Sequence, residues 1–169
     1  MLEIINNLKP FFEDCYRKIN VREYAKIMGI SPPTASIVLS EYLKEGILKK
    51  EIYRRYHLFY ANKESELFIN LSRIYWSIKL KELTDFIEKN LLNPTIIIFG
   101  SLSKAEAKQD SDIDIAIISE KKDINVTHFG KKLGRDIQLF WFNSLSSIKE
   151  SELKNSILNG YLLKGRLKL

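Results

Sequence analysis

The alternation of apolar and polar residues predicts three short helices at the start of the chain. Over residues 2–19, apolar side chains recur at three- and four-residue steps, and Pro10 should divide that helix. A second helix is predicted over 21–28, because Gly29 can close it in the left-handed conformation. A third is predicted over 31–46, since Ser-Pro is a favoured helix start and an apolar stripe follows it. Only a tight turn separates the last two helices.

A basic hairpin is predicted after these helices. The segments 47–53 and 57–61 carry β-branched and aromatic residues, and Arg54-Arg55 stands between them. Helix, turn, helix and hairpin in this order resemble a winged helix-turn-helix domain that extends over residues 1–63. In that family the second helix of the pair enters the DNA major groove and the hairpin contacts phosphates. The resemblance implies eight DNA-binding residues: Pro33, Thr34, Ser36, Ser40, Lys49, Lys50, Arg54 and Arg55.

The charge distribution favours an anionic partner for this first part. The whole chain has a formal net charge of +6 and a pI near 9.3. Residues 1–63 contain 11 Lys and Arg against 7 Asp and Glu, whereas residues 64–169 contain 16 against 14. We therefore expect double-stranded DNA as a partner. A module that contacts only proteins, with Arg54-Arg55 as a solvated turn, is the alternative.

Residues 64–93 should form a helical connector. Apolar side chains at three- and four-residue steps predict one long helix or two in series, and Asn93-Pro94 should end it. The apolar stripe is wider than one small domain needs. It can dock both domains, or it can pair with a second copy of the chain to give a homodimer.

The second half opens on a buried strand followed by a candidate anion site. Residues 95–99 form a β-branched run that ends at Gly100. A glycine lets a phosphate approach the backbone, and a helix capped by Ser101 would offer unpaired N–H groups to it. Lys104 would add a positive charge nearby.

Carboxylates then share one face of two predicted strands. Asp112 and Asp114 alternate with isoleucines, which places both acids on one face about 6–7 Å apart. Like charges at this spacing are unfavourable without a cation between them, and hard oxygen ligands suit Mg²⁺. Asp136, in a strand predicted over 134–142, would complete a triangle if the two strands pair. Such a triangle holds two divalent ions across a phosphoryl transfer. The alternative is an exposed edge strand with solvated acids.

These residues resemble the nucleotidyltransferase superfamily of DNA polymerase beta, and most closely its minimal nucleotidyltransferase branch. The resemblance is carried by Gly100-Ser101, by Asp112-Ile113-Asp114 and by the later strand with Asp136. It implies a mixed sheet with flanking helices, and Mg²⁺- or Mn²⁺-dependent transfer of a nucleoside monophosphate from an NTP, usually ATP, to a hydroxyl. It implies three catalytic and metal-binding residues: Asp112, Asp114 and Asp136. It also implies three nucleotide-binding residues: Gly100, Ser101 and Lys104.

The sequence as a whole predicts an α+β protein of three parts: a winged helix over 1–63, a helical connector over 64–93, and a small mixed-sheet nucleotidyltransferase domain over 94–169. Two functions stay open. One is a Mg²⁺-dependent enzyme that transfers AMP from ATP to a macromolecular acceptor, a nucleic acid or a protein such as a partner toxin, and that also binds DNA. The other is a DNA-binding transcriptional regulator, antitoxin-like and autoregulatory, whose transferase domain senses nucleotide or is inactive.

Composition adds an expectation about where the protein works. No apolar run approaches the ~20 residues of a membrane helix. The first ten residues contain acids and amides where a signal peptide would be apolar. Cys15 is the only cysteine, which excludes an intramolecular disulfide and a cysteine metal cluster. We expect a cytoplasmic protein with no membrane partner.

Overall fold

The computed structural model describes residues 2–167 and divides the chain into two compact units. The first unit extends to Tyr75 and also includes the short segment Ala105–Gln109, and the second unit holds the rest. The change from one unit to the next falls inside helix α5 (Glu66–Lys79), whereas the sequence predicts domain limits at 63 and 93. Residues 1, 168 and 169, at the outer ends of the predicted domains, lie outside the described residues.

The first unit begins with the short helices that the pattern predicts. They are α1 (Glu3–Asn7), α2 (Lys9–Glu13), α3 (Val21–Met28) and α4 (Pro32–Lys44). Pro10 lies in the first turn of α2, so its expected division of the first helix is confirmed. Gly29 closes α3 at φ 66°, and the Ser31 side chain accepts a hydrogen bond from the Thr34 N–H at the start of α4.

A two-stranded hairpin completes the first unit. Strands β1 (Leu48–Tyr53) and β2 (Tyr56–Ala61) are antiparallel, with Tyr53 opposite Tyr56, so Arg54-Arg55 is a two-residue turn. An isolated antiparallel β-bridge joins Ile19 to Phe59 of β2, so the segment at Ile19 lies beside the hairpin. The predicted order of helices and strands is confirmed, whereas the assignment as a winged helix-turn-helix stays a prediction.

The segment Ala105–Gln109 packs with the first unit, although the sequence predicts it within the nucleotidyltransferase domain. The Cys15 N–H donates to the Ala107 carbonyl over 2.7 Å, and Ala105 and Ala107 are fully buried. The segment Ala105–Gln109 is therefore held within the first unit by backbone and packing contacts.

The second unit contains the rest of the secondary structure. Its elements after α5 are α6 (Lys81–Asn90), β3 (Thr95–Ile98), α7 (Gly100–Ser103), β4 (Ile113–Ile118), α8 (Thr127–Leu133), β5 (Ile137–Phe142), the 3₁₀ turn η1 (Leu145–Ser147), α9 (Ser151–Leu158) and β6 (Tyr161–Lys164). Helices α5 and α6 show that the predicted connector is two helices in series. Within residues 2–167, no helix is long and apolar enough to cross a lipid bilayer.

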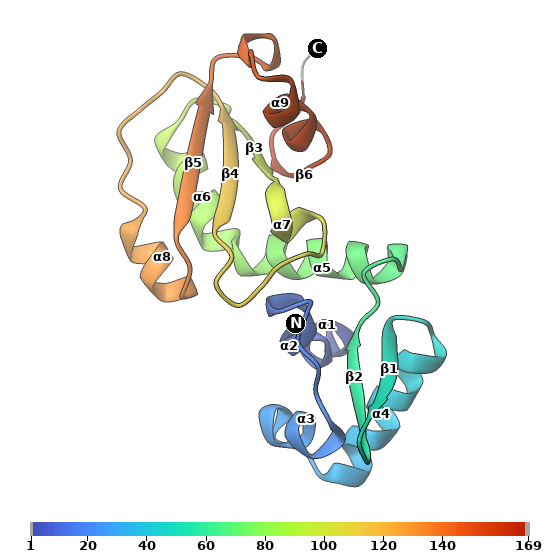
Figure 1. Ribbon diagram of the computed structural model, residues 1–169. Helices are drawn as coiled ribbons and strands as arrows, with labels where there is room; N and C mark the ends of the chain where they lie inside the picture. The colour runs from blue at the N-terminus through green and yellow to red at the C-terminus, as the bar shows by residue number, and fades with distance from the viewer. Residues whose placement is uncertain (1, 168–169) are drawn as a thin grey trace. The chain divides into compact units, whose positions relative to one another are not determined.

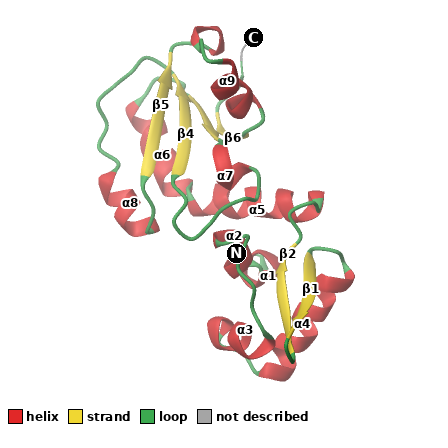
Figure 2. Cartoon of the chain, viewed as in Figure 1, coloured by secondary structure: helices red, strands yellow, loops and turns green. Residues whose placement is uncertain are grey.

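A four-stranded sheet is the framework of the second unit (Figure 1). The strand order is β5-β4-β3-β6; β4 and β5 are parallel, and β3 is antiparallel to both of its neighbours. The predicted α+β class and mixed sheet are therefore confirmed (Figure 2). All four residues of β3 are buried, as its central position requires. Edge strand β6 was not predicted, because four residues at the end of the chain give too short a pattern.

Helices and turns pack against the four-stranded sheet. Side chains of η1 and α9 join β3 and β4 in a core cluster that includes Ile97, Ala116, Leu145 and Ile157. Helix α6 passes behind the sheet in Figure 1. Lys164 of β6 forms ion pairs with Asp85 and Glu88 of α6, at 3.0 and 2.9 Å.

Candidate functional site

The turn after β3 approaches a carboxylate of β4 very closely. The Phe99 N–H donates to the Asp114 carbonyl over 3.1 Å, which continues the β3–β4 ladder to the end of β3. The next residue, Gly100, has φ 69°, and a Cβ built on it would overlap the Asp114 Oδ2 atom. Both the left-handed backbone and the lack of space require glycine here.

Helix α7 begins at Gly100 itself, so the prediction that Ser101 is its N-cap is wrong. Phe99 occupies the N-cap position, and no side chain caps the helix. The physical reason is that the left-handed Gly100 reverses the chain one residue earlier than the pattern predicts. Ser101 is a half-buried residue of α7, and Lys104 is exposed at the end of this four-residue helix. Both predicted nucleotide-binding side chains thus remain within one helical turn of Gly100.

Parallel pairing of β4 with β5 brings the other predicted residues to one face. Asp114 lies opposite Gln138, and the Ile113 N–H donates to the Asp136 carbonyl over 2.8 Å. Because side chains alternate along strands, Asp112, Asp114 and Asp136 project from the same face at the start of the two strands. The strand pairing that the third acid required is confirmed. The Gln138 Nε2 atom donates to Asp112 Oδ2 over 2.6 Å, which fixes that carboxylate.

The electrostatics of the pair fit a cation. Burial, and secondly the negative charge of Asp112, raise the pKa of Asp114 above its ordinary value. Within the part of the chain that the structure describes, neither carboxylate forms an ion pair. Two close carboxylates with hard oxygen donors and no countercharge suit a divalent metal ion.

The third acid is near this pair but is not part of a preformed metal cluster. Among the described residues, no group of three His, Cys, Asp or Glu side chains is arranged to hold a metal ion. Asp136 is exposed, one residue before β5. The geometry therefore supports Asp112 and Asp114 as metal ligands, and the part of Asp136 as a third ligand stays a prediction.

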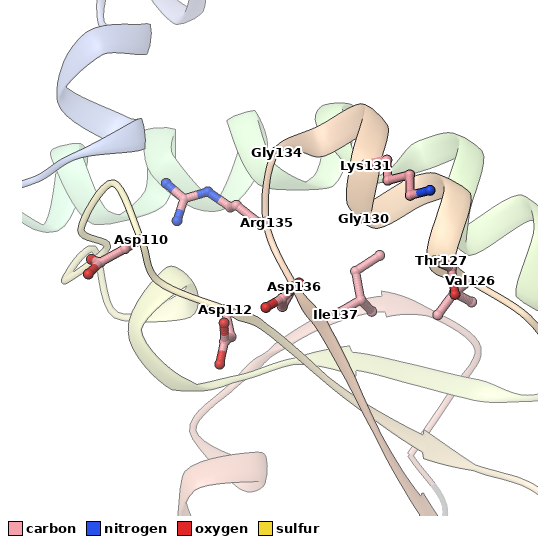
Figure 3. A pocket seen from close by; sticks show the side chains of 10 residues that line it. All are labelled: Asp110, Asp112, Val126, Thr127, Gly130, Lys131, Gly134, Arg135, Asp136 and Ile137. Atoms are coloured by element: carbon pink, nitrogen blue, oxygen red, sulfur yellow. The ribbon is translucent and has the colours of Figure 1, made fainter.

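A cavity of about 610 Å³ adjoins the acids on the β5 side. Figure 3 shows carboxylates at one end of it and the side chains of α8 at the other. Gly100, Ser101, Lys104 and Asp114 do not line it. The residues that do line it are Asp110, Asp112, Val126, Thr127, Gly130, Lys131, Gly134, Arg135, Asp136 and Ile137.

Arg135 supports the site and was not predicted from the sequence. Arg135 is only 8% exposed, and its Nη1 atom donates to the Ser111 carbonyl over 2.6 Å. Its guanidinium also lies 5.2 Å from the ring centroid of Trp76. Arg135 thereby fixes the residue directly before Asp112. Its place directly before the candidate acid Asp136 was the one sequence signal that could have identified Arg135. No comparable signal in the sequence marked the cavity residues Asp110, Thr127 and Lys131.

A known protein family matches most of the second unit. Residues 81–166 match the family described as polymerase beta, nucleotidyltransferase. The chain belongs to this family. The matched region runs from the first turn of α6 to just beyond β6, so it contains Gly100, the three acids and the adjoining cavity. Nucleotidyltransferase domains generally use a nucleoside triphosphate and a divalent metal ion. Among curated proteins, no match to the chain was found.

We predict that Gly100→Ala weakens Mn²⁺ binding about tenfold or more, because its Cβ would displace the Asp114 carboxylate. Isothermal titration of Mn²⁺ into the variant measures this. The control is Gly29→Ala, which has a similar φ of 66° but no atom within 4 Å of the added Cβ. Equal Mn²⁺ affinity in Gly100→Ala and wild type would contradict the assignment of the pair.

Asp114 should reduce the stability of the metal-free protein at neutral pH. Because its pKa is raised in the folded state, the folded protein holds this proton more tightly than the unfolded chain. Wild type therefore loses stability, relative to Asp114→Asn, as pH rises from the usual carboxyl value of 3.8 through the raised pKa. Thermal unfolding with a chelator present, from pH 4 to pH 8, checks this. The expectation is wrong if Asp114→Asn has the lower melting temperature at pH 7.

Proposed function

We propose that the second unit is a Mg²⁺-dependent nucleotidyltransferase that transfers AMP from ATP to a hydroxyl of a macromolecular acceptor. One observation carries the proposal: left-handed Gly100 lies directly against Asp114, whose neighbour Asp112 shares its face. The turn that we propose for the triphosphate and the pair that we propose for the metal ion are thus adjacent. Membership of the nucleotidyltransferase family supports the same reaction class.

Each predicted residue has a chemical part in this reaction. The backbone of Gly100, the Ser101 hydroxyl and the Lys104 ammonium bind the triphosphate. Asp112 and Asp114 hold Mg²⁺, which when bound offsets phosphate charge and polarises the reacting phosphorus. Gln138 keeps Asp112 in place through its 2.6 Å hydrogen bond, and Arg135 holds the backbone before it.

The transfer itself exchanges one phosphorus–oxygen bond for another. The acceptor oxygen forms a bond to the α-phosphorus as the bond to the β-phosphate oxygen breaks, and pyrophosphate leaves. The hydroxyl proton passes to the carboxylate of Asp136, which is exposed beside Asp112 and is free to exchange with solvent afterwards. Positioning and charge stabilisation supply most of the rate in reactions of this class.

Calorimetric titration of ATP, with and without Mg²⁺, tests this proposal. We expect Mg²⁺-dependent binding that Asp112→Asn loses while its far-UV circular dichroism is unchanged, because one of the two metal ligands is gone. Asp123→Asn makes the same change of charge at an exposed loop residue and should bind ATP like wild type. Binding that is independent of Mg²⁺, or equal in both variants, would contradict the proposal.

DNA binding by the first unit is a second proposal, supported by the hairpin turn. Arg54 is in the left-handed region at φ 55°, where glycine or asparagine is usual, and Arg54 and Arg55 are both exposed. An arginine in a backbone conformation that is unfavourable for it suggests that its positive charge has a function. The predicted helix α4 residues Pro33, Thr34, Ser36 and Ser40 are exposed, as is Lys50, whereas Lys49 is paired with Glu64. A transcriptional regulator with a nucleotide-sensing second unit is the corresponding alternative function.

Replacing both turn arginines with alanine should weaken DNA binding in a sequence-independent way. Loss of two phosphate contacts should reduce the slope of log K against log salt by about 1.8. Fluorescence anisotropy with a labelled duplex at several salt concentrations measures this. Lys121→Ala with Lys149→Ala removes the same charge at exposed positions of the second unit and should leave the slope unchanged. If the arginine variant keeps the wild-type slope, the hairpin does not contact DNA.

The predicted homodimer through the connector is also a proposal. Leu67, Ile74 and Ile78 of α5 are exposed by 48%, 39% and 41%, and their spacing places them on one side of the helix. A second copy of the chain is one partner that would cover this stripe.

A further inference from the structure

The cavity beside Asp136 has the position that an acceptor site requires, if the proposed function holds. In a phosphoryl transfer the attacking and leaving oxygens lie roughly in line on opposite sides of the phosphorus. The sheet order places β4, with both metal-binding acids, between β3 and β5. Gly100 and α7 follow β3, so the pyrophosphate leaves on that side. The attacking hydroxyl must then come from the side of β5, where the cavity lies.

Side chains at the two ends of the cavity differ in charge. Asp110, Asp112 and Asp136 line the end nearest the reaction, and Lys131 and Thr127 of α8 line the other (Figure 3). Lys131 is exposed and forms no ion pair in the described part of the chain. Its neighbour Lys132 does not line the cavity and is paired with Glu82 over 2.6 Å. Arg135 also lines the cavity, but its buried guanidinium donates to the Ser111 carbonyl at the carboxylate end. Lys131 is therefore the lining residue that offers a positive charge at the α8 end.

The glycines of the cavity wall leave room for a ligand between these ends. Gly130 and Gly134 place no side chain in the cavity, and Gly134 closes α8 at φ 68°. A volume of about 610 Å³ accommodates a sugar phosphate with water to spare. A ligand anion would be repelled by the carboxylates and attracted by Lys131, and an uncharged hydroxyl end would then lie at Asp136.

We propose that this cavity binds the acceptor, and that Lys131 selects a phosphorylated sugar whose hydroxyl is directed to Asp136. In the transfer, that hydroxyl oxygen bonds to the α-phosphorus of ATP, its proton passes to Asp136, and pyrophosphate carries away the electrons of the broken bond. The same groups occur at the end of a nucleic-acid strand, which agrees with the macromolecular acceptor proposed above, and in a free sugar phosphate, which would replace that acceptor.

Amide NMR titrations of the full-length protein separate the two sites. Gly130 and Gly134 report on the cavity, and Gly100 reports on the nucleotide turn. The probes are ribose 5-phosphate, ribose, a ribotrinucleotide with a free 3′-hydroxyl, and a non-hydrolysable MgATP analogue. We expect ribose 5-phosphate to shift the Gly130 and Gly134 resonances and to bind at least about tenfold more tightly than ribose. Tighter binding of the trinucleotide than of ribose 5-phosphate identifies a strand end as the source, and the reverse identifies a free sugar phosphate.

The matched lysine variants decide the role of Lys131. Lys131→Ala should weaken binding of ribose 5-phosphate about tenfold, whereas Lys132→Ala should change it less than twofold, and neither should alter the Gly100 shift caused by the MgATP analogue. Equal effects of both variants, or equal affinity for ribose and ribose 5-phosphate, would overturn the proposal. If the analogue shifts Gly100 but neither phosphorylated probe shifts Gly130 and Gly134, only the acceptor assignment fails. If the analogue leaves Gly100 unchanged, the proposed function itself fails.

Discussion

The contact between Gly100 and Asp114 is the constraint on which the rest of the site depends. The β3–β4 ladder continues through the Phe99–Asp114 hydrogen bond, so the chain has to turn away directly beside the carboxylate. Any side chain at position 100 would occupy the space of the Asp114 oxygen, and the φ of 69° adds a second reason for glycine. The turn and the acid are thereby held together by the two central strands rather than by a flexible loop.

The same packing makes a cation favourable beside the two acids. Burial raises the pKa of Asp114, and the nearby charge of Asp112 raises it further. Such a pair costs stability in the absence of a cation, and carboxylates with a perturbed pKa cluster at functional sites. Gln138 and Arg135 add support from β5 and from the residue before it, by fixing Asp112 and the Ser111 carbonyl. The strand order then separates the proposed triphosphate side, at β3, from the cavity side, at β5.

Local patterns were sufficient where a feature depends on neighbours in sequence. The alternation around Asp112 and Asp114, and the turn at Gly29, are properties of a few consecutive residues, and the structure has them as predicted. The pairing of Asp136 with this strand could only be stated as a condition, because strand order is set by tertiary packing. The prediction of Ser101 as N-cap was wrong because the position of the turn is decided by two strands. Gly100 follows β3 and lies against Asp114 of β4, and the sequence pattern of one segment does not show that contact.

Features that arise from contacts between distant segments gave no sequence signal. Lys131 reaches the cavity because α8 packs beside β5, and Arg135 lies against Trp76, which is far away in the sequence. The Cys15 N–H donates to the Ala107 carbonyl, and a backbone hydrogen bond of this kind leaves no trace in the pattern of side chains.

We infer that Asp112, Asp114 and the Gly100 turn form one metal–nucleotide site, on which the proposed reaction depends. The most direct test is a crystal structure of the protein with Mn²⁺ and α,β-methylene-ATP, with anomalous scattering data to locate the metal. We expect an anomalous peak within coordination distance of both carboxylates, with the triphosphate on the backbone of Gly100. Nucleotide bound elsewhere, or Mn²⁺ located away from both Asp112 and Asp114, would contradict it.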